Sequence, residues 1–464
     1  MAMTQLFPTP DRRRFLGATA TAFAALAASG CMTRGSGSIA RAPVKSGGFA
    51  GYGPLRPDPA GFLDLPEGFS YHVISRLGDV MDDGGTVPDR ADGMGCFDLG
   101  NGEIALVRNH ELAPQHDAGG LIAKGYGKKN GVFVPGGTTT IVLDAATLAV
   151  KRQFRSLGGT IRNCSGGVTP WGTWLTCEEA PTGPGQPRGD GLEQNHGWVF
   201  EVPASARGLV DAVPLKAMGR FNHEAACVDP ATGIVYQTED RDDSVLYRFL
   251  PKVPGRLAEG GRLQAMVIEG LADTRNWTGS ANGAAMPVGK PYRVSWVDCD
   301  EVEAPQDDLR KRAARKGAAL VARGEGLHMG VNRGVNRGAS EVFACCSSGG
   351  AKQLGQILKL TPGLAGKPDT VELFFESEST DQFNYGDNLT VAPSGHLIVC
   401  EDQYTEVQEN HIRGITPDGR AYTLALLKAQ TELAGGCFSP DGKVLFVNAY
   451  GPTVTMAITG PWVA

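Results

Sequence analysis

The pattern of polar and apolar positions is most informative between Asn163 and Glu179, where the chain reads NCSGGVTPWGTWLTCEE. A Pro-x-Gly turn at 170–172 separates two short extended runs, which predicts a β-hairpin. The pair Asn163-Cys164 precedes the first run and Glu178-Glu179 follows the second, so both pairs fall at the open end of the hairpin. The pattern therefore places a thiol near two carboxylates.

The same unit recurs along the chain: a polar motif, an apolar run, a turn rich in Gly, Pro, Asn or Asp, a second apolar run and a second polar motif. The first motifs are Asp92-Gly93-Met94, Asn163-Cys164-Ser165, Asn222-His223-Glu224, Arg323-Gly324-Glu325, Gly386-Asp387-Asn388 and Ala434-Gly435-Gly436. The second motifs are Asn109-His110-Glu111, Glu178-Glu179, Glu239-Asp240, Cys345-Cys346, Glu401-Asp402 and Asn448-Ala449.

The turn glycines test whether the copies share one register. From Gly172, Gly233 and Gly395 an acidic pair lies six and seven residues downstream each time. Six sheet-forming units in one register predict an all-β fold, a six-bladed β-propeller, in preference to a pair of β-sandwiches. Because neighbouring strands of a blade run antiparallel, the polar motifs should gather at one mouth of the central channel.

One interval between the repeated units is longer than the others. Residues 306–322 have helical composition, with acidic residues first and basic residues after, as the helix dipole favours. We expect a helical insertion before the fourth hairpin, lying as a solvated helix on the outside of the propeller. It would lead the chain back to Arg323 and Glu325 at the mouth.

Composition and charge narrow the classes of function. With 464 residues, 64 of them Gly and 29 Pro, the chain is long enough for one large β-domain. The net charge of −6 and the lack of a Lys/Arg-rich tract outside the predicted helix argue against a nucleic-acid partner. We expect a monomer that acts on a small molecule.

The N-terminus carries a targeting signal for export. The run Asp11-Arg12-Arg13-Arg14-Phe15-Leu16-Gly17 and the Ala-rich stretch after it match the signal read by the twin-arginine machinery. We assign 1–31 to this signal, 32–55 to a flexible linker and 56–464 to one catalytic propeller domain. No transmembrane segment is expected, since no later run is long enough. The predicted location is periplasmic or extracellular, and lipid anchoring at Cys31 stays open beside ordinary cleavage.

Nine carboxylates would meet at the predicted mouth: Glu178, Glu179, Glu224, Glu239, Asp240, Glu325, Asp387, Glu401 and Asp402. They cannot all remain unpaired, because like charges raise one another's pKa and oppose folding. Hard oxygen ligands without a His cluster suit Ca²⁺. Adjacent strand residues face opposite sides, so only one member of each acidic pair needs to line the channel, and the sequence does not say which.

Of the ten cysteines, only Cys164 is expected to have a chemical role. Several others lie in apolar runs, where Cys serves as a small core residue. A thiolate is a poor ligand for calcium and a good one for iron, zinc or copper. We therefore expect a mixed site, in which a transition metal polarises an oxyanion while Ca²⁺ neutralises charge.

The remaining polar residues of the motifs suggest contacts with a substrate. Arg323, beside Glu325, is the best candidate for a bidentate phosphate clamp. Asn109 is uncharged and could reach a substrate oxygen. His110 and His223 are expected to hydrogen-bond within the mouth, with metal ligation the weaker alternative.

The motifs resemble those of the PhoX-type alkaline phosphatases from about residue 55 to the C-terminus. The resemblance rests on Asn163–Glu179, His223-Glu224-Ala225, Thr238-Glu239-Asp240-Arg241, Arg323-Gly324-Glu325-Gly326, Asp387-Asn388-Leu389 and Cys437-Phe438-Ser439-Pro440-Asp441-Gly442. It implies a phosphomonoesterase with two Fe³⁺ ions and two or three Ca²⁺ ions at the propeller mouth. By motif position, the metal ligands would be Cys164, Glu179, Glu224, Glu325 and Asp387, and the phosphate-contacting residue would be Arg323.

Two other functions fit part of this pattern. A calcium-dependent propeller lactonase or arylesterase needs acidic residues and Asn around one Ca²⁺, but it has no use for Cys164. A non-catalytic binding propeller braced by calcium needs neither the thiol nor Arg323. Iron in the purified protein would separate the phosphatase from both alternatives.

Overall fold

The predicted hairpin is present in the computed structural model, which describes residues 51–278, 285–331, 340–364 and 366–463. Strands β10 (Asn163–Val168) and β11 (Thr173–Glu178) pair antiparallel, with Asn163 opposite Glu178. Gly172 closes the turn at φ +81°, a left-handed conformation that glycine adopts without strain. The two polar pairs therefore lie at the open end of the hairpin, as predicted.

Antiparallel meanders make up the larger sheets. One consists of β4 (Ala91–Gly100), β5 (Glu103–His110), β8 (Gly136–Asp144) and β9 (Val150–Thr160), and the next adds β12 (Val199–Pro203) to β10 and β11. A nine-stranded sheet runs β13 (His223–Val228), β14 (Val235–Glu239), β15 (Tyr247–Pro251), β16 (Gly261–Ile268), β17 (Tyr292–Asp298), β21 (Asp369–Glu376), β20 (Gln356–Thr361), β19 (Ser340–Cys346) and β18 (Gly324–Val331).

The last two large sheets combine strands from both ends of the described chain. One runs β22 (Gly386–Val391), β23 (Leu397–Glu401), β24 (His411–Ile415), β25 (Ala421–Leu427), β2 (Leu63–Pro66) and β1 (Leu55–Arg56). The other runs β26 (Leu433–Phe438), β27 (Val444–Ala449), β28 (Val454–Thr459) and β3 (Ser70–Arg76). A small two-stranded sheet joins β6 (Lys128–Lys129) to β7 (Val132–Phe133).

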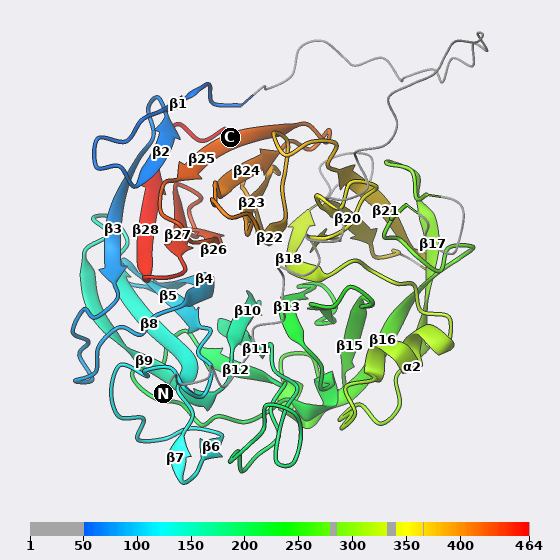
Figure 1. The fold of residues 1–464 in the computed structure, drawn as a ribbon, viewed down its shortest axis with the longest axis horizontal. Helices are drawn as coiled ribbons and strands as arrows, with labels where there is room; N and C mark the ends of the chain where they lie inside the picture. Colours follow the sequence, from blue (N-terminus) through cyan, green and yellow to red (C-terminus); the bar gives the residue numbers. More distant parts are fainter. Residues whose placement is uncertain (1–50, 279–284, 332–339, 365, 464) are drawn as a thin grey trace, which may run out of the picture. The chain divides into compact units, whose positions relative to one another are not determined.

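The sheets are arranged around a common centre (Figure 1). Their inner strands contact one another in the order β4, β10, β13, β18, β22 and β26, and β26 returns to contact β4. The pairing of β3 with β28 ties the N-terminal part of the ring to its C-terminal part. The all-β class and a propeller-like arrangement are therefore confirmed.

The inner strands approach one another closely because small residues lie at their contacts. A Cβ atom added to Gly167 would overlap the carbonyl oxygen of Ala226, and one added to Gly326 would overlap the backbone of 387–389. Between the sheets, apolar side chains form the core; one cluster joins Phe343, Ile357 and Val399 from three different strands. The backbone of the inner strands is therefore held by close contacts between these strands and by the apolar core between the sheets.

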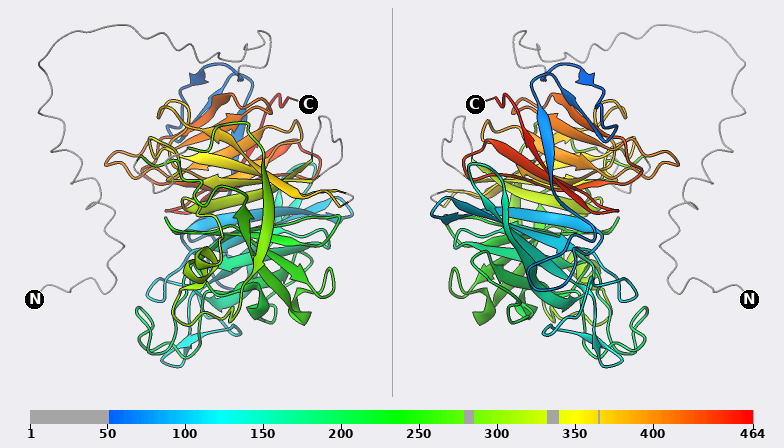
Figure 2. Two further views of the ribbon diagram at one scale, coloured as in Figure 1. Left: turned by 90° about the vertical axis from the view of Figure 1, so that its right-hand side faces the viewer. Right: turned by 90° about the vertical axis from the view of Figure 1, so that its left-hand side faces the viewer.

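The predicted helical insertion is present but short. Helix α2 covers Leu309–Arg315, with Arg312 and Arg315 in its last turn, whereas the sequence suggested helical composition over 306–322. It lies outside the strands β15 and β16 (Figures 1 and 2). Its buried residues Leu309 and Ala313 join the core cluster that includes Leu263 of β16. The only other helical elements described in these ranges are two 3₁₀ turns, Lys216–Met218 and Leu257–Glu259.

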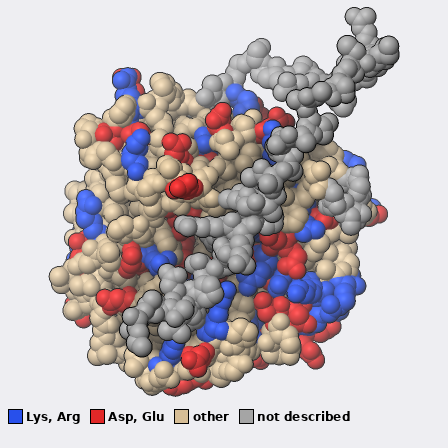
Figure 3. Space-filling model, in the orientation of Figure 1, with Lys and Arg blue, Asp and Glu red and all other residues tan. Residues whose placement is uncertain are grey.

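The surface beside α2 is densely charged with both signs (Figure 3). Arg312 pairs with Asp308 of the preceding turn at 3.0 Å, and Lys316 pairs with Asp300. These ion pairs explain how the basic residues on the outer face of the helix are accommodated, and that face is solvated as expected, whereas Leu309, Arg310 and Ala313 are buried.

Three predictions concern the N-terminal segment. The twin-arginine signal over 1–31 and the anchoring alternative at Cys31 lie outside the described residues, as does most of the 32–55 linker. Gly51–Ala464 forms one compact unit by its contacts. Among the described residues, no helix has both the length and the apolar character needed to cross a membrane.

Candidate metal centre

Each inner hairpin carries the same irregularity at its open end. The pairing register shifts directly after the first residues of β4, β10, β13, β18, β22 and β26. Such bulges re-aim side chains at sheet rims and next to functional sites. The residues at the first shifted position of the first five hairpins are Asp92, Cys164, Glu224, Glu325 and Asp387. The sixth hairpin has Ala434 near this position, without a donor side chain.

In each hairpin, two further positions are joined by the same backbone hydrogen bond. The residue after the second strand donates its backbone N–H to the carbonyl of the residue before the first strand, at 2.8–3.1 Å in all six hairpins. These pairs are Glu111 and Arg90, Glu179 and Arg162, Asp240 and Asn222, Ser347 and Arg323, Asp402 and Tyr385, and Tyr450 and Glu432. The repeated backbone geometry thus brings acidic side chains and arginines to one end of the inner strands.

Two groups of donor atoms are close enough to share metal ions. One joins Cys164, Glu179 and Glu224, and the other joins Glu224, Glu325 and Asp387, with the donor atoms of each group within 4.8 Å of one another. Glu224 belongs to both groups, so the two potential sites are adjacent. Its Oε1, like Oδ1 of Asp387 and Oδ1 of Asp92, is buried without a hydrogen-bond partner. Buried carboxylate oxygens without partners are expected where a cation binds.

Burial perturbs the ionisation of these groups in the metal-free protein. It raises the pKa of Glu179 to about 8 and that of Asp387 to about 7. Burial also raises the pKa of Glu224 and of the Cys164 thiol, and neighbouring carboxylates add to both shifts. Without cations, these carboxyl groups and the thiol therefore tend to stay protonated in the folded protein.

Two arginines partly neutralise the centre. Arg162 pairs with Glu111 and Glu179. Arg323 binds both oxygens of Asp240, at 2.6 Å and 3.0 Å, and lies 3.2 Å from Glu325. Burial alone would raise the pKa of Asp240, but Arg323 outweighs it and holds that pKa below its usual range.

The backbone at Cys164 is held by the buried side chain of Asn109. Its Nδ2 donates to the carbonyls of Cys164 and Ser165 at 3.0 Å and 2.8 Å, and its Oδ1 accepts from Trp174 and Thr176. All the hydrogen-bonding capacity of the Asn109 side chain is used, and it is fully buried. Asn109 therefore lies where it positions the Cys164 bulge, and its predicted contact with a substrate oxygen stays a prediction.

Similar hydrogen bonds hold two other bulges. The hydroxyl of Thr238 donates to the carbonyl of Glu325 at 2.6 Å, and the amide of Asn448 donates to the carbonyl of Asp92 at 2.7 Å. In each case the donor comes from the second strand of one hairpin and the acceptor from the first strand of the next. These bonds couple neighbouring hairpins directly behind the candidate ligands.

The structure separates the members of the three acidic pairs. The first members, Glu178, Glu239 and Glu401, are fully buried and bind other protein groups. Glu178 accepts from His196 and from the backbone of Ile161, Gly197 and Trp198; Glu239 binds Tyr247 and Arg310; Glu401 binds His411 and Arg413. The second members interact with groups of the centre: Glu179 with Cys164 and Glu224, Asp240 with Arg323, and Asp402 with Asp387.

The two positions of a pair can be distinguished by mutation. We expect Glu178→Gln to lower the free energy of unfolding by about 1–3 kcal/mol, because one of several buried hydrogen bonds is lost, with the metal content unchanged. The matched Glu179→Gln variant should lose metal. Thermal unfolding and metal analysis of both variants check this; metal loss from Glu178→Gln would contradict it.

The two histidines of the motifs point away from the donor groups. His110 binds the carbonyl of Asp89 and the hydroxyl of Thr139, and burial lowers its pKa. His223 Nε2 binds the carbonyl of Gly219, and its ring lies 3.6 Å from that of Phe221. All nine described cysteines are free, and Cys164 is the one among them that joins a donor group.

Four charged residues of the centre were not among the predicted site residues. They are Asp92, Glu111, Arg162 and Glu432. Asp92 and Glu111 stand in the motifs of the first hairpin, but they were not counted among the mouth carboxylates. In the strand pairing Asp92 takes the position of Cys164, one residue away from where the repeated motifs align it. Arg162 precedes its hairpin as Arg323 does. Glu432 precedes the sixth hairpin, where no acidic pair marks the motif.

The fold and the centre define a β-propeller-like protein with a buried acidic and thiol centre at one end of its inner strands. The family profile for alkaline phosphatase PhoX matches residues 50–147 and 142–453. The chain belongs to the PhoX alkaline phosphatase family, which makes it a phosphoesterase.

One solved structure agrees at the level of the fold. The structure of Pseudomonas fluorescens PhoX in complex with vanadate, a transition state analogue, matches with a TM-score of 0.65 and 18% identity over 86% of this chain and 96% of that one. A gluconolactonase from Xanthomonas campestris, XC5397, matches with a TM-score of 0.38 and 14% identity over 88% and 98%. No curated protein matches the chain significantly.

Proposed function

We propose that this protein hydrolyses phosphate monoesters at a mixed iron and calcium centre and releases inorganic phosphate. The observation that carries the proposal is the sulfur of Cys164 grouped with Glu179 and Glu224, next to a second group made only of carboxylates. A centre for calcium alone, as in a propeller lactonase, would gain nothing from this thiol.

The donor atoms fit these metals. Cys164 with Glu179 and Glu224 suits iron, because soft and hard donors combine there. Glu224, Glu325 and Asp387 offer only oxygen, as calcium prefers, and Asp92, Asp402 and Glu432 supply further carboxylates nearby. When bound, such ions polarise a phosphoryl oxygen and neutralise charge. The partnerless oxygens of Asp92, Glu224 and Asp387 support this assignment.

Arg323 is suited to bind the phosphoryl group. Its Nε and Nη2 are directed at Asp240 and Glu325, so its orientation is fixed before a substrate arrives. Nη1 lies 3.4 Å from the Tyr404 hydroxyl, a longer contact than those that Nε and Nη2 make with Asp240. The N–H groups on this side can therefore donate to phosphate oxygens and stabilise their charge in the transition state.

Metal-dependent hydrolysis is the direct test of the proposal. We expect the purified protein to contain iron and calcium and to hydrolyse p-nitrophenyl phosphate. Chelation should abolish this activity, and adding back both metals should restore it, because the carboxylates lose their counterions without them. Full activity in a preparation free of iron would contradict the mixed centre, and no hydrolysis by the metal-loaded protein would contradict the function.

Arg323→Ala should weaken inhibition by inorganic phosphate and lower kcat by about 10²-fold, the usual effect of losing one transition-state donor. Iron and calcium should be retained, because Arg323 supplies no ligand atom. Steady-state kinetics with phosphate as inhibitor measure the effect, and Arg241→Ala, which removes a neighbouring half-buried guanidinium, is the control. Unchanged phosphate inhibition would remove Arg323 from this role.

We also propose that the ring has six blades. The nine-stranded sheet can be divided at the short pairing of β17 with β21, which spans three residue pairs, into two meanders that each begin with an inner strand. With the other four large sheets, this gives one blade for each inner hairpin. Export by the twin-arginine route to the periplasm or beyond completes the proposal.

A further inference from the structure

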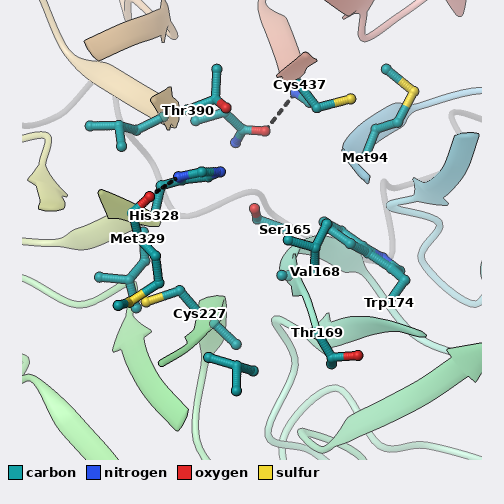
Figure 4. A pocket seen from close by; sticks show the side chains of 18 of the residues that line it. Met94, Ser165, Val168, Thr169, Trp174, Cys227, His328, Met329, Thr390 and Cys437 are labelled. Atoms are coloured by element: carbon teal, nitrogen blue, oxygen red, sulfur yellow. Dashed lines mark hydrogen bonds between the residues drawn. The ribbon is translucent and has the colours of Figure 1, made fainter. Parts of the chain in front are cut away.

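The inner strands enclose a cavity that the proposed chemistry does not use. Its volume is about 280 Å³, near the lower end of the 300–1,000 Å³ common for ligand pockets. All six inner strands contribute to its lining, including Met94, Val168, Cys227, Met329, Thr390 and Cys437 (Figure 4). The candidate ligands lie at the start of these strands, whereas Val168 ends β10. The cavity therefore extends from Ser165 and Asn388, which follow candidate ligands in the chain, toward the turn end of the strands.

The lining indicates an uncharged ligand. Apolar and thioether side chains dominate it, and none of the described lining residues is Asp, Glu, Lys or Arg. His328 is the one ionisable ring, and burial lowers its pKa, which keeps the imidazole neutral. An ion placed here would lose its hydration without gaining a partner.

One polar group in the lining lacks a partner. The Asn388 side chain is 5% exposed, and its Oδ1 accepts from the backbone N–H of Gly435 at 2.6 Å. Its Nδ2 is buried beside the neighbouring Asp387 but forms no hydrogen bond of normal geometry within the described residues. A buried amide N–H without an acceptor is costly, so a ligand acceptor placed here would be favoured.

Other polar side chains also face the cavity. The hydroxyl of Ser165 and the ring of His328 point into the space between the strands (Figure 4). At the outer edge, Val168 is 40% exposed, so the cavity can be reached from the turn end of the hairpins. A mostly apolar wall with a few convergent polar groups is the usual composition of a small-molecule site.

We propose that this cavity binds a small, uncharged, mostly apolar molecule that carries one hydrogen-bond acceptor, such as an aromatic ketone, with the acceptor directed at Nδ2 of Asn388. The site borders the candidate metal centre through Asn388, but the proposal does not rest on phosphatase activity.

Fluorine NMR on the full metal-loaded protein tests the proposal with two matched probes. We expect 4-fluoroacetophenone to bind saturably, and 4-fluoroethylbenzene, which lacks the acceptor, to bind about fivefold more weakly, since one net hydrogen bond changes an equilibrium by that factor. Asn388→Leu should remove the difference between the probes. Val168→Trp, at the exposed edge, should block both.

Two results would overturn the assignment. Equal binding of the probes to the wild-type protein would show that Asn388 provides no directed donor. Undiminished ketone binding to Val168→Trp would place the probe elsewhere. Neither result depends on whether Asn388→Leu folds, and both can be obtained whether or not the protein hydrolyses phosphate esters.

Discussion

Cys164→Ala is expected to lose iron and to hydrolyse p-nitrophenyl phosphate at least about 10³-fold more slowly than the wild-type protein. The factor corresponds to the several kcal/mol of charge stabilisation that a metal ion supplies in a transition state. The sulfur is the only soft donor in the two groups, and Glu179 and Glu224 alone leave a set of hard oxygens. Metal analysis and steady-state kinetics measure both effects.

The fold should survive this substitution, because the bulge at 164 is held through its backbone carbonyl by Asn109. Cys177→Ala is the matched control: Cys177 is also buried in the same hairpin, but it packs in an apolar core cluster. It should retain iron and activity with a modest loss of stability. Iron bound normally by Cys164→Ala would refute the proposed ligand, and iron lost from both variants would point to a general effect of destabilisation.

The hairpin register was predictable because it depends on local chemistry. A glycine in a left-handed turn fixes where the second strand begins, and Gly172, Gly233 and Gly395 all adopt positive φ. From there, strand geometry carries the acidic pair to the open end. The same reasoning predicted the ring of inner hairpins and placed Cys164 at one mouth with Glu179 and Glu224.

The choice within each acidic pair was not predictable, because it depends on tertiary contacts. Glu178 turns away from the centre toward His196, and Glu239 turns toward Arg310 of helix α2. Each partner lies at least 18 residues away in sequence, so no local pattern signals it. The positioning role of Asn109 was not predictable for the same reason, because the carbonyls that accept its hydrogen bonds belong to the next hairpin.

The helix was predicted too long, because composition alone does not locate its end. Gly317, at φ +96°, follows Lys316 and terminates α2 after two turns. Arg310 of this helix pairs with the buried Glu239, so the insertion also supports the inner hairpin. A helix that was expected to be solvated on the surface therefore contributes a buried arginine.

Metal removal should reverse the dependence of stability on pH. In the metal-free protein, the pKa of Glu179 is raised to about 8 and that of Asp387 to about 7, so the folded state binds more protons than the unfolded state between about pH 4 and 8. The stability these groups provide is present at low pH and lost as the pH rises through this window. We expect the Tm of the metal-free protein to fall by about 10 °C between pH 5 and pH 9.

The groups with lowered pKa do not cancel this trend. Arg162 and Arg323 outweigh burial and lower the pKa of Glu111 and of Asp240, so the stability from these two carboxylates is already complete above about pH 5. Metal binding adds stability as the pH rises, because the ligands bind metal only when they are deprotonated. This trend is opposite to that of the carboxyl groups whose pKa is raised. The Tm of the metal-loaded protein should therefore stay level or rise over the same range.

Circular dichroism melts of both forms, from pH 5 to pH 9, measure the difference. Asp387→Asn removes one of the titrating groups, so its metal-free form should show a shallower fall in Tm than the wild-type protein. A control at Asp441, whose exposed carboxylate has a lowered pKa from hydrogen bonds to Ser439 and Lys443, should leave the slope unchanged. If the Tm of the metal-free protein rose with pH, the crowded carboxylates would not be the groups that require a cation.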